Sequence, residues 1–365
     1  MKKVVITGGH GPSAKAVIEE IKREKSKWQI FYFGRKYTLE GSKEKSFEYQ
    51  ELKNDAEINF ISLTSGRLQR HFSIYTLSSL LKTPLGLITS LFWLKKIKPD
   101  IIISFGGYLS VPVVIAGWML KIPSITHEQT RSVGLANKIN SHFVKKIALS
   151  FPETLKQTPF KKAILTGNPM INFSSPSQKS PLRSLISKVN KPILLVTGGK
   201  SGSRTINNVI KKIKKELKNK FFIVHQVGLD RQNILGQERG YLAVPFIKSN
   251  NFGWILNRSA MVISRSGANI VWQLAALKKR AILIPIPWSS GDEQKKNAEF
   301  LREIGLAKII PQNKLTARVL MGAVNKFQKE KIDLHYPNWW LRVNPQKAAQ
   351  KVWQLAQKVS LLNES

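Results

Sequence analysis

The chain has 365 residues, 42% of them hydrophobic, which suits two domains that can each bury a core. It has no cysteine, which excludes disulfide bonds and thiolate metal sites. The formal net charge is +37, and so strong a field attracts polyanions such as nucleic acid, anionic lipid headgroups or phosphorylated substrates. The lysines are spread along the whole chain, which argues against a dedicated nucleic-acid patch. The alternative explanation of the high positive charge is adaptation to a salty or crowded interior, without a specific partner.

The N-terminus, MKKVVITGGHGPS, has too short an apolar run for a signal peptide and predicts a first strand followed by glycines. The longest apolar runs, 85–94 and 111–120, are too short or too interrupted to span a bilayer. We therefore expect a cytoplasmic protein that does not cross the membrane.

Short β-branched runs alternate with helical stretches along both halves of the chain. Continuous apolar strands alternating with helices predict parallel sheets covered on both faces, and two such sets predict two doubly wound α/β domains. The expected strands are 4–7, 30–33, 101–104, 124–126, 147–149 and 163–165, then 193–197, 221–225, 241–244, 261–264, 281–286 and 307–310. We expect a linker at 167–184, which is rich in Pro, Ser and Asn, and a final helix at about 345–361.

Glycine or polar residues follow five of these strands, where open parallel sheets bind their ligands. These segments are 8–11, 105–108, 127–129, 198–202 and 265–269. Each glycine pair alone is weak evidence. Together the segments favour a cleft between two domains that holds a phosphate-bearing ligand.

The stretch 261–287 predicts a strand at 261–264, a small-residue turn at 265–269, a helix through about Leu277 and a strand at 280–285. The turn lets a ligand approach the backbone, and a helix N-terminus directly after it suits a phosphate. An ordinary strand–helix–strand crossover without a ligand is the alternative.

Several blocks occur in a fixed order from residue 1 to about 310. They are the glycine loop at 8–11, FGGYLSVP at 105–112, HEQTRSVGLANK at 127–138, GNP at 167–169, GGKSGSRTINN at 198–208, HQVG at 225–228, SRSGAN at 264–269 and DEQKKNA at 292–298. With these blocks the chain resembles the MurG family, whose members transfer N-acetylglucosamine from UDP-N-acetylglucosamine (UDP-GlcNAc) to a lipid-linked muramyl-pentapeptide.

The resemblance implies the GT-B fold, with two Rossmann-like domains facing across a cleft. It implies a membrane-facing acceptor domain at 1–166, a UDP-sugar-binding domain at 167–340, and a C-terminal helix at 341–365 that returns to the first domain. The implied activity is that of a hexosyltransferase in peptidoglycan and cell-wall synthesis, and hence in cell shape and division. It would be a peripheral protein on the cytoplasmic face of the membrane.

The family reaction is an inverting displacement, which needs a base for the acceptor hydroxyl and stabilisation of the departing diphosphate. The aspartates, at 55, 100, 230, 292 and 333, are isolated and form no Asp-x-Asp pair that could hold a metal. We therefore expect no metal and no cofactor, with charge neutralisation by helix N-termini and cationic side chains.

The resemblance also implies the site residues. His10 and Glu128 are the candidate bases; for His10 the alternative is an exposed loop histidine, and for the 127–129 block a structural role. We favour His10 because a neutral histidine is a base near neutral pH without any pKa shift. The expected substrate-binding residues of the first domain are Gly9, Gly107, Tyr108, His127, Thr130 and Asn137. Those of the second are Lys200, Ser201, Gly202, Asn207, Ile247, Arg265, Ser266, Gly267, Ala268, Asn269, Gln273, Gln294 and Asn297.

This sequence departs from the family pattern at several of these positions. The first glycine loop is shortened, Thr130 stands where the family has Asn, and Ile171 replaces an Arg after GNP. Lys200 and Ser201 replace Ser-Gln, and Lys200 could supply the cation lost at Ile171. Gln273 replaces the Glu expected at the ribose hydroxyls and offers one acceptor oxygen where Glu offers two. Affinity for UDP should then be weaker, or the donor different.

The stretch 74–100 predicts a helix with a broad apolar face. Leu77, Leu80, Leu81, Ile88, Leu91 and Phe92 form one stripe, Leu85, Leu87, Trp93 and Leu94 widen it, and lysines 82, 95, 96 and 98 flank it. A broad apolar face beside basic residues suits a membrane interface. A buried helix interrupted by Pro84 and Gly86 is the alternative, and the resemblance favours the interface.

Other functions stay open at this level. The same fold could serve a UDP-sugar 2-epimerase, although few acidic residues follow the strands, or a degenerate, non-catalytic binding protein. No nucleic-acid-binding motif is visible, so we expect no nucleic-acid partner.

Overall fold

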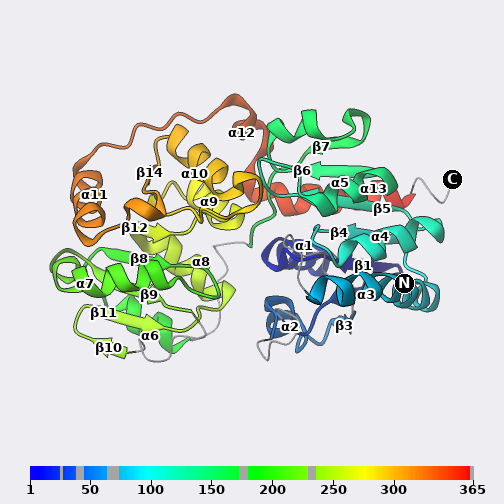
Figure 1. Cartoon of the computed structure of the whole chain (residues 1–365), viewed down its shortest axis with the longest axis horizontal. Coiled ribbons are helices and arrows are strands. Elements are labelled where there is room, and N and C mark those ends of the chain that lie inside the picture. Colours follow the sequence, from blue (N-terminus) through cyan, green and yellow to red (C-terminus); the bar gives the residue numbers. More distant parts are fainter. Residues whose placement is uncertain (25–27, 38–44, 64–73, 172–179, 229–235, 362–365) are drawn as a thin grey trace. The chain divides into compact units, whose positions relative to one another are not determined.

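The computed structural model describes residues 1–24, 28–37, 45–63, 74–171, 180–228 and 236–361. The chain forms two compact units. Unit 1 comprises Met1–Met170 together with Arg342–Ser365, and unit 2 comprises Ile171–Leu341. Each unit carries a seven-stranded sheet with helices packed on it (Figure 1).

The sheet of unit 1 is parallel throughout, in the order β3-β2-β1-β4-β5-β6-β7. Its strands are β1 (Lys3–Thr7), β2 (Gln29–Gly34), β3 (Ile58–Ser62), β4 (Ile101–Ser104), β5 (Ser124–Glu128), β6 (Lys146–Leu149) and β7 (Ala163–Leu165). The chain moves outward from β1 to β2 and β3, then returns to the other side of β1 with β4. This reversal makes the carboxyl ends of β1 and β4 the point where such sheets bind ligands.

The helices of unit 1 are α1 (Gly11–Arg23), α2 (Phe47–Leu52), α3 (Ile74–Ile97), α4 (Ser110–Met119), α5 (Leu135–Phe143) and α13 (Ala348–Leu361), with 3₁₀ turns η1 (Pro152–Gln157), η2 (Phe160–Lys162) and η6 (Pro345–Lys347). The last helix, α13, packs against α1, β4, β5 and β6 (Figure 1). Its Trp353 is fully buried and meets Trp28 edge to face, with ring centroids 4.9 Å apart. The C-terminal segment therefore completes the core of unit 1.

The sheet of unit 2 has the order β10-β11-β9-β8-β12-β13-β14 and is parallel except for the β10–β11 pair. Its strands are β8 (Ile193–Thr197), β9 (Phe222–Gln226), β10 (Gly236–Glu238), β11 (Tyr241–Val244), β12 (Ser259–Ser264), β13 (Arg280–Leu283) and β14 (Ala307–Ile309). The reversal lies between β8 and β12, so the loops after these two strands occupy the ligand-binding position.

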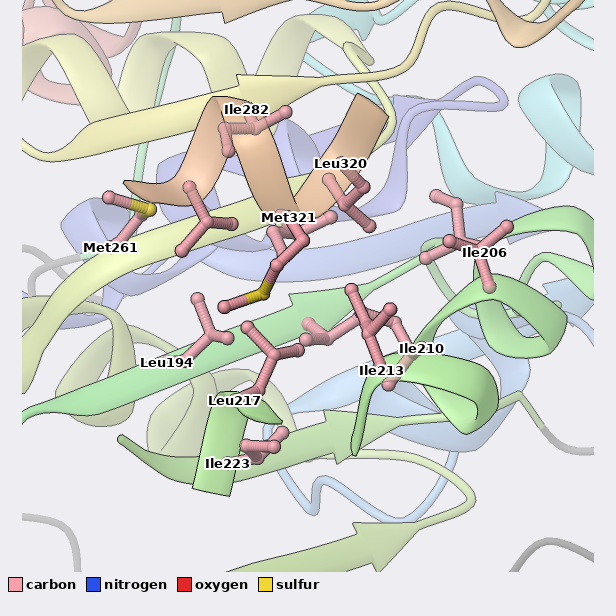
Figure 2. Packing of buried hydrophobic residues seen from close by; sticks show 14 of the residues in the cluster. Leu194, Ile206, Ile210, Ile213, Leu217, Ile223, Met261, Ile282, Leu320 and Met321 are labelled. Atoms are coloured by element: carbon pink, nitrogen blue, oxygen red, sulfur yellow. The ribbon is translucent and has the colours of Figure 1, made fainter. Parts of the chain in front are cut away.

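The helices of unit 2 are α6 (Pro181–Ser187), α7 (Arg204–Lys220), α8 (Ser249–Arg258), α9 (Ala268–Ala276), α10 (Glu293–Glu303), α11 (Ala317–Lys329) and α12 (Asn338–Val343), which crosses the boundary to unit 1, with 3₁₀ turns η4 (Ser290–Asp292) and η5 (Gln312–Lys314). Figure 2 shows the buried side chains of α7 and α11 meeting those of the strands. Ile206, Ile210 and Ile213 of α7 recur at helical spacing and point into this cluster, where Leu320 and Met321 of α11 join them.

Several sequence expectations need correction at the level of elements. Strand β5 runs through Glu128, so His127 and Glu128 end the strand instead of following it. Helix α9 begins at Ala268, which places Asn269 in the helix and not in the turn, and β13 ends at Leu283. Strands β3 and β10 were not expected, because both are edge strands whose residues include polar or exposed ones and give no continuous apolar run. The central part of the expected linker, 172–179, lies outside the described residues.

Candidate functional site

Two glycine loops meet backbone to backbone at the carboxyl ends of β1 and β4. The N–H of Gly9 donates to the carbonyl of Gly106 at 3.0 Å. Gly8 has a φ of +133°, and a Cβ there would lie 2.8 Å from the Gly106 carbonyl oxygen. Gly107, with φ +77°, would place a Cβ 3.0 Å from the Gly9 nitrogen. Only glycine fits this contact, which fixes the segment that carries His10.

His10 is the residue that precedes α1, and its carbonyl accepts the first helical hydrogen bonds, from Ser13 and Ala14. The imidazole is half-buried, and its Nδ1 lies 2.6 Å from the side-chain amide of Gln129. No described residue forms a hydrogen bond with Nε2. Burial lowers the pKa of His10 below its usual value; the negative charge of Glu128 opposes the shift and Arg35 adds to it. The ring is therefore neutral near pH 7.

Glu128 is buried, and hydrogen bonds occupy both of its carboxylate oxygens. Oε1 accepts from the Thr130 N–H at 3.0 Å and from the Thr130 hydroxyl at 2.8 Å. Oε2 accepts from the Gly134 N–H and from the Asn137 amide, each at 2.9 Å. Because Gly134 immediately precedes α5, the carboxylate fixes the start of that helix. Thr130 supplies two of the four donors.

Buried polar side chains continue this network behind Glu128. His127 is 1% exposed, and its Nε2 lies 3.0 Å from the carbonyl of Gly167. Burial lowers the pKa of His127 to about 4, so the ring is neutral and donates from Nε2 to that carbonyl. Asn137 also donates to the His127 carbonyl and accepts from Thr126 at 2.7 Å. His127 and Asn137 thus have protein partners for their side chains.

Tyr108 follows the glycines after β4 and is half-buried. The Arg35 guanidinium carbon lies 5.9 Å from the Tyr108 ring centroid, within cation–π range. Since Arg35 comes directly after β2, three neighbouring strands of unit 1 bring side chains to this edge of the sheet.

In unit 2, the corresponding edge carries the turn before α9. Ser266 is fully buried; its hydroxyl donates to the backbone carbonyl of Gln294 at 2.7 Å, and its N–H reaches Gln294 Oε1 at 3.3 Å. Gln294 Oε1 also accepts from Ile286, and Asn297 donates to the Ser266 carbonyl at 3.2 Å. Gln294 and Asn297 therefore brace the turn. Beside it, a Cβ on Gly267 would meet no protein atom within 4 Å.

Arg265 is 8% exposed, and its guanidinium joins three loops at this edge. It donates to the Ile284 carbonyl at 3.0 Å, to the Ser203 hydroxyl at 2.8 Å and to Gln312 Oε1 at 2.6 Å. Burial lowers its pKa from the usual arginine value. The side chain fastens the loops that follow β8, β13 and β14.

The glycine-rich loop after β8 bends back on the segment after β9. Gly202 has φ +68°, and a Cβ there would lie 2.0 Å from the carbonyl oxygen of Val227. Asn207, on α7, is 1% exposed and donates to the same carbonyl at 2.8 Å. Its Oδ1 lies 3.0 Å from His225 Nε2, so both ends of this amide are engaged inside unit 2. Lys200 is half-buried and Ser201 exposed in this loop.

The remaining expected binding residues of unit 2 lie in the segment after β11 and in α9. Ile247 is buried, and its N–H donates to Gln226 Oε1 at 3.0 Å. Ala268 is the first residue of α9, followed by Asn269. Gln273 is half-buried in the second turn of α9.

Comparison with known proteins identifies the group to which these two units belong. Residues 5–149 match the glycosyltransferase family 28 N-terminal domain, and residues 193–338 match the glycosyltransferase family 28 C-terminal domain. The chain belongs to glycosyltransferase family 28.

Two curated enzymes illustrate the relation within family 28. Both carry the name UDP-N-acetylglucosamine–N-acetylmuramyl-(pentapeptide) pyrophosphoryl-undecaprenol N-acetylglucosamine transferase. The enzyme of Clostridium botulinum (strain Langeland) is 34% identical over 334 residues, which are 89% of this chain and 90% of that enzyme. The enzyme of Borreliella burgdorferi is 33% identical over 327 residues, which are 89% of this chain and 86% of that enzyme.

Solved structures show the same GT-B fold. The crystal structure of Acinetobacter baumannii MurG has a TM-score of 0.65 at 23% identity, covering 98% of this chain and 100% of that one. The UDP-GlcNAc 2-epimerase of Neisseria meningitidis, bound to UDP-GlcNAc, has a TM-score of 0.68 at 14% identity, with the same coverage. The fold thus agrees with two reaction classes, and the family assignment rests on the sequence relation.

The expected apolar stripe of α3 divides between the core and the surface. Leu94 is fully buried, and Leu87, Leu91 and Trp93 pack against the same core cluster. The exposed apolar residues of the described part of α3 are Leu85, Ile88 and Phe92, and α4 adds Trp118 and Met119. Side chains of 77–82 lie outside the described part. In the part of α3 whose side chains are described, the exposed apolar stripe is therefore narrower than expected. No helix of the described residues has the length and hydropathy to cross a membrane.

Family motifs alone did not single out Gln129 as a site residue. It belongs to the 127–129 block, in which His127 and Glu128 are the residues that the family resemblance implies for the site. Its contact with His10 joins residues 119 positions apart. Gln129 could have been predicted as a site residue because it is the third polar residue in a row at the end of β5. The strand β1, which precedes His10, lies in the same sheet.

Proposed function

We propose that the chain transfers N-acetylglucosamine from UDP-GlcNAc to a lipid-linked muramyl-pentapeptide. The observation that carries the proposal is the identity of 33 to 34% with enzymes of that name, over about nine-tenths of this chain. The UDP-GlcNAc 2-epimerase has only fold-level similarity, at 14% identity.

In this proposal, His10 is the general base for the acceptor hydroxyl. A base needs an available lone pair and must be deprotonated near neutral pH. His10 meets both needs, because burial lowers its pKa and no described residue engages Nε2. Glu128 is the weaker candidate, because both of its carboxylate oxygens already accept hydrogen bonds from Thr130, Gly134 and Asn137. Glu128 instead orients α5 and the residues around His10.

Unit 2 is proposed to bind the UDP-sugar at the start of α9. The first N–H groups of a helix and its dipole favour an anion, and the open side of Gly267 leaves room for a phosphate close to the backbone. Lys200 would supply additional positive charge, Gln273 would bond to the ribose hydroxyls, and Ile247 would contact the uracil ring.

The acceptor carries a lipid, and unit 1 has a surface that suits attachment to a membrane. Leu85, Ile88 and Phe92 are exposed on one side of α3. Lys95 and Lys96 are exposed at its C-terminal end. Apolar side chains beside lysines favour the interface of an anionic membrane. We propose that this face of α3 holds the enzyme at the inner surface of the membrane.

The test is incubation with UDP-GlcNAc and lipid-linked muramyl-pentapeptide, followed by mass spectrometry. We expect a product heavier than the acceptor by one N-acetylhexosamine, with release of UDP. Conversion of UDP-GlcNAc without acceptor would indicate an epimerase, and nucleotide binding without either reaction a non-catalytic protein.

His10→Ala should lower turnover by about 100-fold or more while donor affinity stays nearly constant. His142→Ala is the matched control, because His142 is an exposed histidine of the same unit. Near-normal turnover of His10→Ala would remove His10 as the base.

A further inference from the structure

A chain of buried polar side chains leads from His10 into unit 1. Gln129 is 5% exposed, and Ser13 and Asn168 are fully buried. His10 Nδ1 lies 2.6 Å from the Gln129 amide, and the other end of that amide lies 3.4 Å from the Ser13 hydroxyl. Ser13 Oγ lies 3.1 Å from Asn168 Oδ1. These hydrogen-bonded side chains thus connect the loop after β1 to α1, to the end of β5 and to the segment after β7.

The number of protons available for donation restricts how these side chains can form hydrogen bonds with one another. A serine hydroxyl has one proton, so Ser13 can donate to Asn168 or to Gln129 but not to both. If it donates to Asn168, at the shorter distance, it can accept from the Gln129 NH₂ group. The Gln129 oxygen then faces His10 and accepts from Nδ1–H. The oxygen and nitrogen of a glutamine amide are interchangeable by a flip that leaves the heavy-atom positions the same.

We propose that Gln129 is a positioning residue that holds the His10 proton on Nδ1 and leaves the Nε2 lone pair available to accept a proton. The inference rests on the proposed function, in which His10 is the base. The arrangement has one donor for each of its three hydrogen bonds: His10 Nδ1–H donates to Gln129, a Gln129 N–H to Ser13, and the Ser13 O–H to Asn168. The reverse arrangement places the proton on Nε2 and removes the basic lone pair.

An amide suits this position because it orients the ring without adding charge. Three charged or titratable groups face His10: Glu128 at the end of β5, Arg35 after β2, and His127 on β5. Glu128 favours the imidazolium, whereas Arg35 and the burial of the ring favour the neutral form. A carboxylate at position 129 would add a second negative charge and stabilise the imidazolium, which cannot act as a base.

Two substitutions of Gln129 distinguish the effect of orienting the His10 ring from the effect of adding a charge beside it. Gln129→Glu keeps the shape but can only accept when ionised, so it retains Nδ1–H and raises the pKa of His10. Gln129→Met keeps the length and removes both hydrogen-bonding atoms. Gln357→Met is the control: Gln357 bonds to Glu24, at the opposite end of α1 from His10.

The first measurement is the nitrogen NMR spectrum of ¹⁵N-histidine-labelled protein, with the His10 signals assigned by His10→Ala. We expect the Nδ1–H tautomer in the wild type and in Gln129→Glu, and a mixture of tautomers in Gln129→Met. A wild-type ring protonated on Nε2 would overturn the inference. So would an unchanged tautomer in Gln129→Met. This readout needs no turnover and decides the inference even if the proposed transfer reaction is absent.

The second measurement is the pH dependence of kcat with UDP-GlcNAc and the lipid-linked acceptor. The acidic limb should move up by about one pH unit or more in Gln129→Glu. Gln129→Met should lose about tenfold or more in kcat with the KM for donor nearly unchanged. Gln357→Met should match the wild type in both. An acidic limb at the wild-type position in Gln129→Glu would contradict the assigned role.

Discussion

Arg265 takes a positive charge into the interior of unit 2, where its three recorded acceptors are neutral oxygens. Each acceptor comes from a different loop, and a planar guanidinium can reach all three at once. At the scale of single residues, this arrangement makes Arg265 a clamp for the turn before α9.

Arg265→Lys should destabilise unit 2 by about 2 kcal/mol, because an ammonium cannot serve the three acceptors and leaves buried groups without donors. We expect weaker UDP binding as well, since the loops that the clamp fixes carry Ser203 and the turn before α9. Differential scanning calorimetry and titration calorimetry with UDP measure the two effects. Arg318→Lys, an exposed arginine on α11, is the control. Unchanged stability of Arg265→Lys would contradict the clamp.

Lys200 is expected to act through the diphosphate, so its removal should discriminate between ligands. Lys200→Ala should weaken UDP by about tenfold, the scale of one hydrogen bond to a charged group, and leave uridine nearly unaffected. Lys211→Ala, an exposed lysine of α7, controls for the loss of one charge from the same unit. Equal losses for UDP and uridine would place Lys200 away from the phosphates.

At the scale of elements, the described part of α3 carries apolar residues both on the side packed against the core and on the exposed side. Leu87, Leu91 and Leu94 recur at spacings of three and four and pack toward the sheet, whereas Leu85, Ile88 and Phe92 recur similarly on the exposed side. A helix with apolar residues on both sides gives no clear sequence signal for which side is exposed. The packing of α4 and the strands against α3 decides it.

Changing Leu85, Ile88 and Phe92 together to Ser should release the protein from anionic liposomes at high salt. Salt screens the attraction of the lysines, so binding that persists in salt reports the apolar contact. Flotation measures binding, and circular dichroism should show that the variant remains folded. Val319→Ser with Leu341→Ser, two exposed apolar residues of unit 2, should bind as the wild type does. Undiminished binding of the triple variant would refute the proposed membrane face.

Leu91→Ser with Trp93→Ser, by contrast, should unfold unit 1, because these side chains pack against its core.

At the scale of the whole molecule, the described part of each unit contains one buried histidine whose pKa is lowered to about 4. In unit 1 it is His127, bonded to Gly167. In unit 2 it is His225, held between Tyr241 and Asn207 at 2.9 and 3.0 Å. Burial is the leading cause of both shifts. Between pH 6.5 and 4, the unfolded chain binds protons that the folded units do not, so both units lose stability as the pH falls.

Stability should therefore decrease from pH 7 to pH 5 by about 2 kcal/mol for each of these histidines, from a slope of roughly 1.4 kcal/mol per pH unit. Urea unfolding at the two pH values measures the difference. His225→Gln should reduce the pH-dependent loss for unit 2 alone, and His127→Gln that for unit 1 alone. The exposed His335→Gln is the control. An unchanged pH-dependent loss for unit 2 in His225→Gln would exclude this linkage.

The sequence by itself determined the two parallel α/β sheets and the family to which they belong. Buried parallel strands need continuous apolar runs, and ligand-binding loops follow such strands. Both features can therefore be recognised from short stretches of the sequence. Residues 8–11 and 264–269 were recognised for that reason.

Only the tertiary structure decided how the polar side chains pair. Gln129 reaches His10 across 119 positions, and Arg265 reaches Ser203 across 62. Both His10 and Glu128 are candidate bases in the sequence, with His10 favoured, and only the folded chain places four donors from Thr130, Gly134 and Asn137 on Glu128. A buried polar group takes the partner that the folded backbone brings within about 3 Å, and no local pattern in the sequence encodes that distance.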